Sequence, residues 1–160
     1  MYAKYQYSAG ATTANILADV LAIVTGESNV NNLSASCDKA NSTIVADVAA
    51  GWVLHDGAAG TNAKSVKAPL ADDAATFKYV VLDTNTASSI FTKVYETWDA
   101  GTHAGTNKCN NSDTASYNQQ VNTTTGGILH IFATARFLLM ASQLGSTWGS
   151  STNAGGSGCF

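Results

Sequence analysis

Short apolar runs, separated by clusters of Asn, Ser and Gly, follow one another at intervals of roughly ten residues through most of this chain. This spacing is typical of antiparallel strands joined by turns. The pattern therefore predicts a mainly β fold, an antiparallel β-sandwich or barrel-like domain. The candidate strands are Thr43–His55, Ser65–Ala68, Phe77–Asp83, Ser89–Thr97, Ile128–Ala135 and Phe137–Ser142.

One segment before these runs, TTANILADVLAIVTGES, has helical periodicity. Thr12 or Thr13 can cap its first turn by accepting a backbone N–H bond, and Gly26 can adopt the left-handed conformation that ends a helix. The sequence predicts one N-terminal helix from about Thr13 to Thr25. Its apolar stripe consists of Ile16, Leu17, Val20, Leu21 and Val24.

The segment HIFATARFLLMAS is open to two interpretations. Ala, Arg, Leu and Met are good helix formers, which favours a helix. Gly126 and Gly127 precede it as a hairpin turn would, which favours strands. We expect two strands here.

The first seven residues, MYAKYQY, alternate aromatic and polar side chains with the period of a strand. We interpret residues 1–10 as an N-terminal arm or edge strand. As an arm, the segment would pair with another subunit, so that its deletion would weaken assembly more than folding. Residues 11–145 are expected to form a single β-rich domain, and residues 146–160 a Gly/Ser-rich C-terminal tail.

Charged residues make up 12% of the 160 residues, about half the usual share of roughly 25%. Such a composition fits a surface that is neutral and polar or is covered by neighbouring subunits. The net charge is −3 and no Lys/Arg cluster occurs, which argues against nucleic-acid binding. The apolar stretch Ile16–Val24 is too short to span a bilayer and contains Asp19, so we expect no membrane association.

The most concentrated polar chemistry lies in YETWDAGTHAGTNKCNNSD, residues 95–113. Asp99 and His103 are four residues apart, but Gly101 between them argues against a ligand-bearing helix. Cys109 has no helix N-terminus after it to lower its pKa, which argues against a cysteine nucleophile. We expect Asp99–Gly101 to turn the chain out of the sheet, followed by an exposed polar loop of about a dozen residues, long for a compact domain.

Oxygen ligands in the same stretch raise the possibility of a calcium site, but their spacing does not match an EF-hand. Loop solubility explains the same residues. We therefore expect no enzyme activity, no metal and no cofactor. The candidate oxygen ligands are Asp99, Asn107, Asn110, Asn111 and Asp113.

Three cysteines, Cys37, Cys109 and Cys159, are widely spaced and lack a zinc-type pairing. We interpret them as buried or half-buried thiols that act as small apolar residues. One disulfide and one free thiol is the alternative.

Several segments, taken in order, resemble small virion structural proteins of tailed bacteriophages: TTANILADVLAIVTGE, AAGWVLHD, VKAPLADDAATFKYVVLD, VYETWDAGTHAGTN, GGILHIFATARFLLM and WGSSTNAGGSGCF. The resemblance implies a tail, baseplate or capsid-decoration component assembled in the host bacterial cytoplasm. Its partners would be other copies of itself and other virion proteins, with a homo-oligomer expected. The resemblance transfers no functional residues, because the implied role is assembly.

The leading hypothesis is therefore a non-enzymatic structural subunit that assembles through protein–protein contacts. A second hypothesis is a secreted β-sandwich for carbohydrate binding or adhesion, with Trp52, Trp98 and Trp148 as a stacking platform. A third is an enzyme that uses the Asp99–Cys109 stretch. Under the leading hypothesis, the expected interface residues are Tyr2, Tyr5, Tyr7, His103, Asn107 and Phe160.

Overall fold

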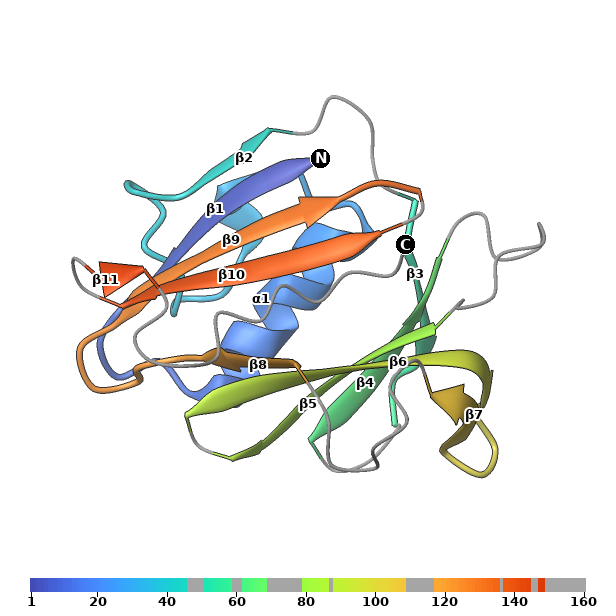
Figure 1. Ribbon diagram of the computed structural model, residues 1–160. Coiled ribbons are helices and arrows are strands. Elements are labelled where there is room, and N and C mark those ends of the chain that lie inside the picture. Colours follow the sequence, from blue (N-terminus) through green and yellow to red (C-terminus); the bar gives the residue numbers. More distant parts are fainter. Residues whose placement is uncertain are drawn as a thin grey trace.

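The computed structural model describes residues 1–45, 51–58, 62–68, 79–86, 88–108, 117–135, 137–144 and 147–148, and within them two antiparallel sheets pack with a single α-helix (Figure 1). The expected mainly β, sandwich-like architecture with an N-terminal helix is confirmed. The first sheet has the order β11–β10–β9–β1–β2, formed by Thr147–Trp148, Leu138–Leu144, Gly127–Ala133, Tyr2–Tyr7 and Thr43–Val45. The second has the order β3–β4–β5–β6–β7, formed by Val53–Asp56, Ala63–Lys67, Tyr79–Thr86, Ser89–Asp99 and Ala104–Lys108, and β8 (Tyr117–Gln120) also pairs with β6.

The helix α1 spans Thr13–Thr25, as the sequence predicts. Oγ1 of Thr12 accepts a 3.2 Å hydrogen bond from the N–H of Asn15, which satisfies one of the free amides of the first turn. At the other end, Gly26 has a φ of 125°, a conformation that side chains rarely adopt. A short 3₁₀ turn, η1 (Val30–Asn32), follows.

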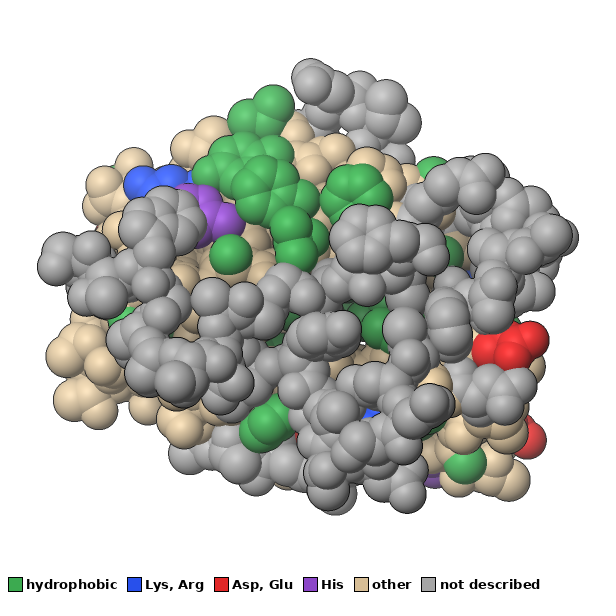
Figure 2. Space-filling model, viewed as in Figure 1, with side chains coloured by type: hydrophobic (Ala, Val, Ile, Leu, Met, Phe, Trp, Pro, Cys, Tyr) green, Lys and Arg blue, Asp and Glu red, His purple; other side chains and the backbone are tan. Residues whose placement is uncertain are grey.

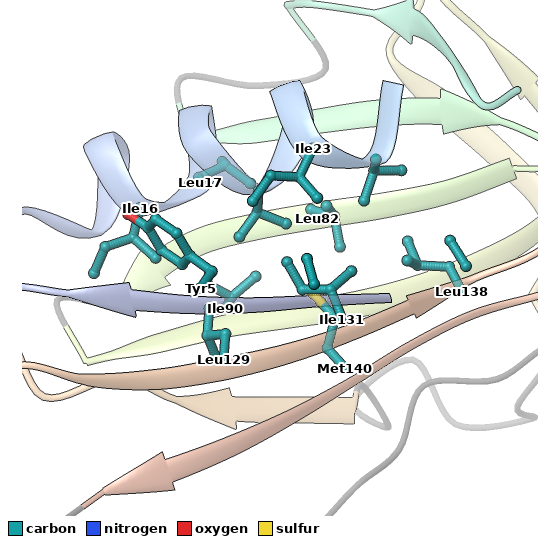
Figure 3. Packing of buried hydrophobic residues seen from close by; sticks show 14 of the residues in the cluster. Tyr5, Ile16, Leu17, Ile23, Leu82, Ile90, Leu129, Ile131, Leu138 and Met140 are labelled. Atoms are coloured by element: carbon teal, nitrogen blue, oxygen red, sulfur yellow. The ribbon is translucent and has the colours of Figure 1, made fainter. Parts of the chain in front are cut away.

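The core lies where α1 meets the inner faces of both sheets (Figure 3). The buried stripe of α1 includes Ile23, which the predicted stripe omitted, whereas Leu21 is only half-buried. From the first sheet, Leu129 and Ile131 point toward the helix, and from the second, Leu82 and Ile90 do so. Burial of such side chains, about 1.5–3 kcal/mol each, holds the layers together.

β1 pairs on both sides, with β9 from Tyr2↔Phe132 to Tyr7↔Gly127 and with β2 from Tyr2↔Val45 to Lys4↔Thr43. The strand expected in MYAKYQY is therefore confirmed, but its position as an arm or edge strand is wrong. Every second side chain of β1, from Ala3 to Tyr7, is buried in the core. Deletion of β1 would remove an interior strand of the first sheet, between β9 and β2, so we expect it to disrupt folding before assembly.

The segment HIFATARFLLMAS forms β9 and β10, which confirms strands over the helix. Their hairpin turns at Thr134, whose N–H donates to the carbonyl of Phe137. The turn expected at Gly126–Gly127 is not a hairpin turn, because the preceding strand, β8, pairs with β6 of the other sheet. Gly126, with a φ of 77°, instead lies where the chain passes from one sheet to the other.

Other predicted strand boundaries differ more from those in the structure. The predicted strand Thr43–His55 corresponds to β2 and β3, which belong to different sheets, and residues 46–50 lie outside the described part. The polar loop expected after Gly101 is wrong for its first part, because β7 pairs back onto β6 through Thr97↔Thr106 and Asp99↔Ala104. The predicted strands Ser65–Ala68, Phe77–Asp83 and Ser89–Thr97 overlap β4, β5 and β6, and residues 77–78 lie outside the described part.

Candidate functional site

The outer face of the first sheet carries a row of apolar side chains across four strands. The cross-strand register aligns Val45, Tyr2, Phe132 and Leu139. Val45 and Phe132 remain 44% and 38% exposed, and Tyr2 and Leu139 are half-buried. Figure 2 shows hydrophobic side chains gathered over β1, β2 and β9 on this side of the molecule. We call these four residues the apolar row.

Directly beside the apolar row lie Lys4 and His130, which face each other across β1 and β9. The hydroxyl of Tyr2 and Nδ1 of His130 share a hydrogen bond of 2.9 Å, and the two rings stack with centroids 6.1 Å apart. The ring of Tyr2 also packs on the ring of Phe132, with centroids 4.9 Å apart. These contacts hold Tyr2 against the sheet, so the row presents an ordered surface.

A second cluster lies at the end of the second sheet, where β3 meets the β6–β7 hairpin. Its centre is Asp56, which is 4% exposed. Oδ2 of Asp56 accepts hydrogen bonds from Nε1 of Trp98 at 2.8 Å and from Nδ1 of His103 at 2.9 Å. Oδ1 accepts from the N–H of Ala58 at 2.9 Å. The carboxylate thus fastens the hairpin to β3.

The electrostatics of this cluster follow from those bonds. Desolvation raises the pKa of Asp56, but the hydrogen bonds from His103, Trp98 and Ala58 outweigh it and hold the pKa below its usual value. Because an ionised carboxylate only accepts, Nδ1 of His103 carries the proton that it donates. The side chain of His103 is 42% exposed, and its φ of 54° fits the tight turn before β7.

Around Asp56, the aromatic packing is close. Trp98 packs on Tyr95 with ring centroids 5.1 Å apart. A Cβ added to Gly105 would lie 2.6 Å from Cγ of Tyr95 and 2.8 Å from Cε3 of Trp98, so only glycine fits there. The ring of His55 packs on the ring of Tyr79, with centroids 4.8 Å apart. Together with this packing, the Asp56–His103 hydrogen bond holds the β6–β7 hairpin against β3.

An Asp–His pair also occurs in catalytic sites, where the histidine in turn activates a nucleophile. In the part of the chain that the structure describes, no Ser, Thr or Cys side chain hydrogen-bonds to His103. Nor does any group of three or more His, Cys, Asp and Glu in this part lie close enough to hold a metal ion. What the bonds of Asp56 to Trp98, His103 and Ala58 do show is a structural role, because they join the β6–β7 hairpin to β3.

The sequence-predicted interface residues are divided between these places. Tyr5 and Tyr7 are 0% and 1% exposed and belong to the core of the chain itself. Tyr2 lies in the apolar row, and His103 belongs to the Asp56 cluster. Asn107 lies on β7, and Phe160 is outside the described residues.

The other residues singled out by the sequence are also spread apart. Cys37 is buried with a free thiol, and Cys109 and Cys159 lie outside the described part. Trp52 is 2% exposed and donates through Nε1 to the carbonyl of Thr134 at 2.7 Å, so it is no stacking platform. Trp98 is half-buried within the Asp56 cluster.

Asp56 and the apolar row are the features that sequence reasoning missed. Asp56 precedes Gly57 as in many turns, and nothing in the sequence marks His103, 47 residues away, as its partner. The apolar row combines single residues from four strands, so no contiguous motif contains it.

A scan of the sequence against protein-family models found no match, and searches of curated proteins and of solved structures found none either. Among the described residues, no helix has the length and apolar character needed to cross a membrane.

Proposed function

We propose that this chain is a non-enzymatic structural subunit of a bacteriophage virion, a component of the tail, the baseplate or the capsid-decorating layer. It assembles through protein–protein contacts with other copies of itself and with other virion proteins. Its place of action is then the virion, assembled in the host bacterial cytoplasm. The sequence resemblance to small virion proteins and the sparse charge of the chain support this proposal.

The single observation that carries the proposal is the apolar row. Val45, Tyr2, Phe132 and Leu139 lie side by side on one solvent-facing sheet surface. Isolated apolar side chains are common on protein surfaces, but neighbouring ones that include aromatic residues are characteristic of contact surfaces. An aromatic side chain held in place at the centre, as Phe132 is by Tyr2, is the usual anchor of such a contact.

Charge favours another copy of this chain as the occupant of the row. Lys4 is the only fixed charge among the described strand residues of this face. The chain as a whole carries a net charge of −3, so other parts of a second copy offer carboxylates to Lys4. Repetition of one modest contact by symmetry gives a stable assembly.

The mass of the native species tests the proposal. We expect light scattering on the purified chain to show a closed oligomer or a larger assembly whose share rises with concentration. A chain that stays monomeric at every concentration and joins no particle would contradict the proposal.

A further inference from the structure

A polar hollow of about 450 Å³ opens at the C-terminal end of β1. It lies on the same outer face of the first sheet as the apolar row, but at the opposite end of the strands. Its size falls within the range of about 300–1,000 Å³ of small-molecule sites. Side chains from four separate parts of the chain reach it: Gln6, Asp38, Thr125 with Ile128, and Gln143. We call this cavity the polar hollow.

Two glycines shape one wall of the polar hollow. Gly126 has a φ of 77°, and a Cβ on it would lie 2.5 Å from the carbonyl oxygen of Tyr7. A Cβ on Gly127 would lie 2.5 Å from the hydroxyl of Tyr7. That hydroxyl in turn accepts a 3.0 Å bond from the N–H of Asn122. The turn before β9 therefore lies directly against Tyr7, which is fixed in the core.

The polar atoms of the wall are arranged by hydrogen bonds among themselves. Oδ2 of Asp38 accepts from Nε2 of Gln6 at 3.2 Å and from Nδ2 of Asn41 at 2.9 Å. The first of these bonds turns the Gln6 amide so that it shares the wall with the carboxylate. Ile128 lies between Gln6 and Gln143 in the cross-strand register, with an apolar surface between two amides.

The charge of the lining residues determines which class of ligand the polar hollow can bind. None of the described lining residues is Lys, Arg or His, so a phosphate or carboxylate ligand would find no counter-charge. Asp38 is the only acid among them, too few for a divalent cation that takes several oxygen ligands. Amides, a carboxylate and hydroxyls together offer both donors and acceptors, which suits ligand hydroxyl groups that donate and accept at once.

We propose that the polar hollow binds a neutral polyhydroxylated ligand, a monosaccharide unit of a glycan. Asp38 and Gln6 accept and donate to neighbouring sugar hydroxyls, and Ile128 packs against the C–H face of the ring. The site uses no tryptophan and none of the four residues of the apolar row. Sugar binding by the monomeric chain therefore stands or falls separately from the proposed function. Ligand efficiencies of small ligands set the expected dissociation constant on the order of 1 mM.

The test is a titration of the isotope-labelled chain with glucose, galactose, mannose and N-acetylglucosamine, followed by amide NMR shifts. At least one sugar is expected to give saturable shifts at residues 8, 38 and 125–128. Gln6→Ala should weaken that binding by about 10-fold, because it removes two polar atoms of the wall. Thr125→Val, in the turn on the opposite side of the polar hollow, provides a second variant if Gln6→Ala fails to fold.

Gln120→Ala is the matched control, because Gln120 is also a half-buried strand glutamine but lines a different hollow. It should leave the sugar-induced shifts unchanged. The proposal is overturned if no sugar gives saturable shifts, if the shifts lie elsewhere, or if the folded Gln6 or Thr125 variant binds as the control does.

Discussion

The hydroxyl of Tyr5 donates a 2.8 Å hydrogen bond to Oδ2 of Asp19, which joins β1 to α1 inside the core. Asp19 is 3% exposed. Its Oδ1 accepts a 2.7 Å hydrogen bond from the N–H of Ser34, and its Oδ2 accepts a 2.8 Å bond from the Ser34 hydroxyl. A carboxylate on the buried side of a helix is costly unless it is hydrogen-bonded. These three bonds explain why Asp19 interrupts the apolar stripe of α1 without breaking the fold.

Tyr5→Phe should lower the free energy of unfolding by about 1–3 kcal/mol, because it takes one partner from a buried carboxylate. Urea unfolding of a dilute sample measures this change. Tyr2→Phe is the matched control: it also deletes a tyrosine hydroxyl bond, but on the half-buried outer face, and should cost less than about 1 kcal/mol. Equal losses for the two variants would refute the role assigned to Asp19.

Tyr5 and Tyr7, the two buried tyrosines of β1, should resist ionisation at alkaline pH. Burial, followed by the hydrogen bond to Asp19 and its charge, raises the pKa of Tyr5. Burial also raises the pKa of Tyr7, partly offset by the bond from the N–H of Asn122. Because folding raises both pKa values, their contribution to stability is complete below the ordinary tyrosine value of about 10 and is lost as the pH rises above it.

Ultraviolet absorbance of tyrosinate, recorded together with circular dichroism, follows this transition. We expect Tyr5 and Tyr7 to ionise only as the β signal disappears. Ionisation of all six tyrosines near pH 10 with an intact β signal would show that the two side chains are not buried as described.

Asp56 should make the folded chain sensitive to acid. Its pKa lies below its usual value, so its contribution to stability is present above the usual carboxyl pKa of about 3.9 and is lost as the pH falls through the lowered value. Urea unfolding from neutral pH down to about pH 2 should show wild type losing its advantage over Asp56→Asn as the pH falls. A difference that stays constant over this range would mean that the ionised carboxylate contributes nothing.

Gly105→Ala should destabilise the β6–β7 hairpin by about 1–3 kcal/mol, since its Cβ would overlap Tyr95 and Trp98. The emission of Trp98 should shift as the indole moves from Asp56. Gly57→Ala is the control, because its Cβ would meet only Cδ2 of Leu54 at an ordinary 3.6 Å. If the two variants have the same stability and emission, the close packing over Gly105 is wrong.

The part of the fold that could be predicted depends on local signals. α1 was predicted to the residue because Thr12 and Gly26 act within one turn of the helix ends. β7, in contrast, has the sequence AGTNK, with no apolar alternation, and forms because β6 offers it a backbone ladder. β1 looked like an edge strand because both of its neighbours, β2 and β9, come later in the sequence.

The candidate sites were harder to predict for the same reason. The bond between Asp56 and His103 depends on the register of the strands from β3 to β7. The apolar row depends on the register of β2, β1, β9 and β10, each of which supplies one residue. Tyr2 was expected at an interface because of its aromatic ring, but the sequence did not reveal that Phe132 lies beside it.

The proposed contact between copies through the apolar row is tested most directly by the assembly of Phe132→Glu. Sedimentation velocity should show this variant folded but dissociated, with association weakened by at least about 10-fold, because a buried charge replaces the central aromatic side chain. Val53→Glu, at a 61% exposed position of the other sheet, should assemble as wild type does. Unchanged assembly of Phe132→Glu, or equal dissociation of both variants, would contradict the account.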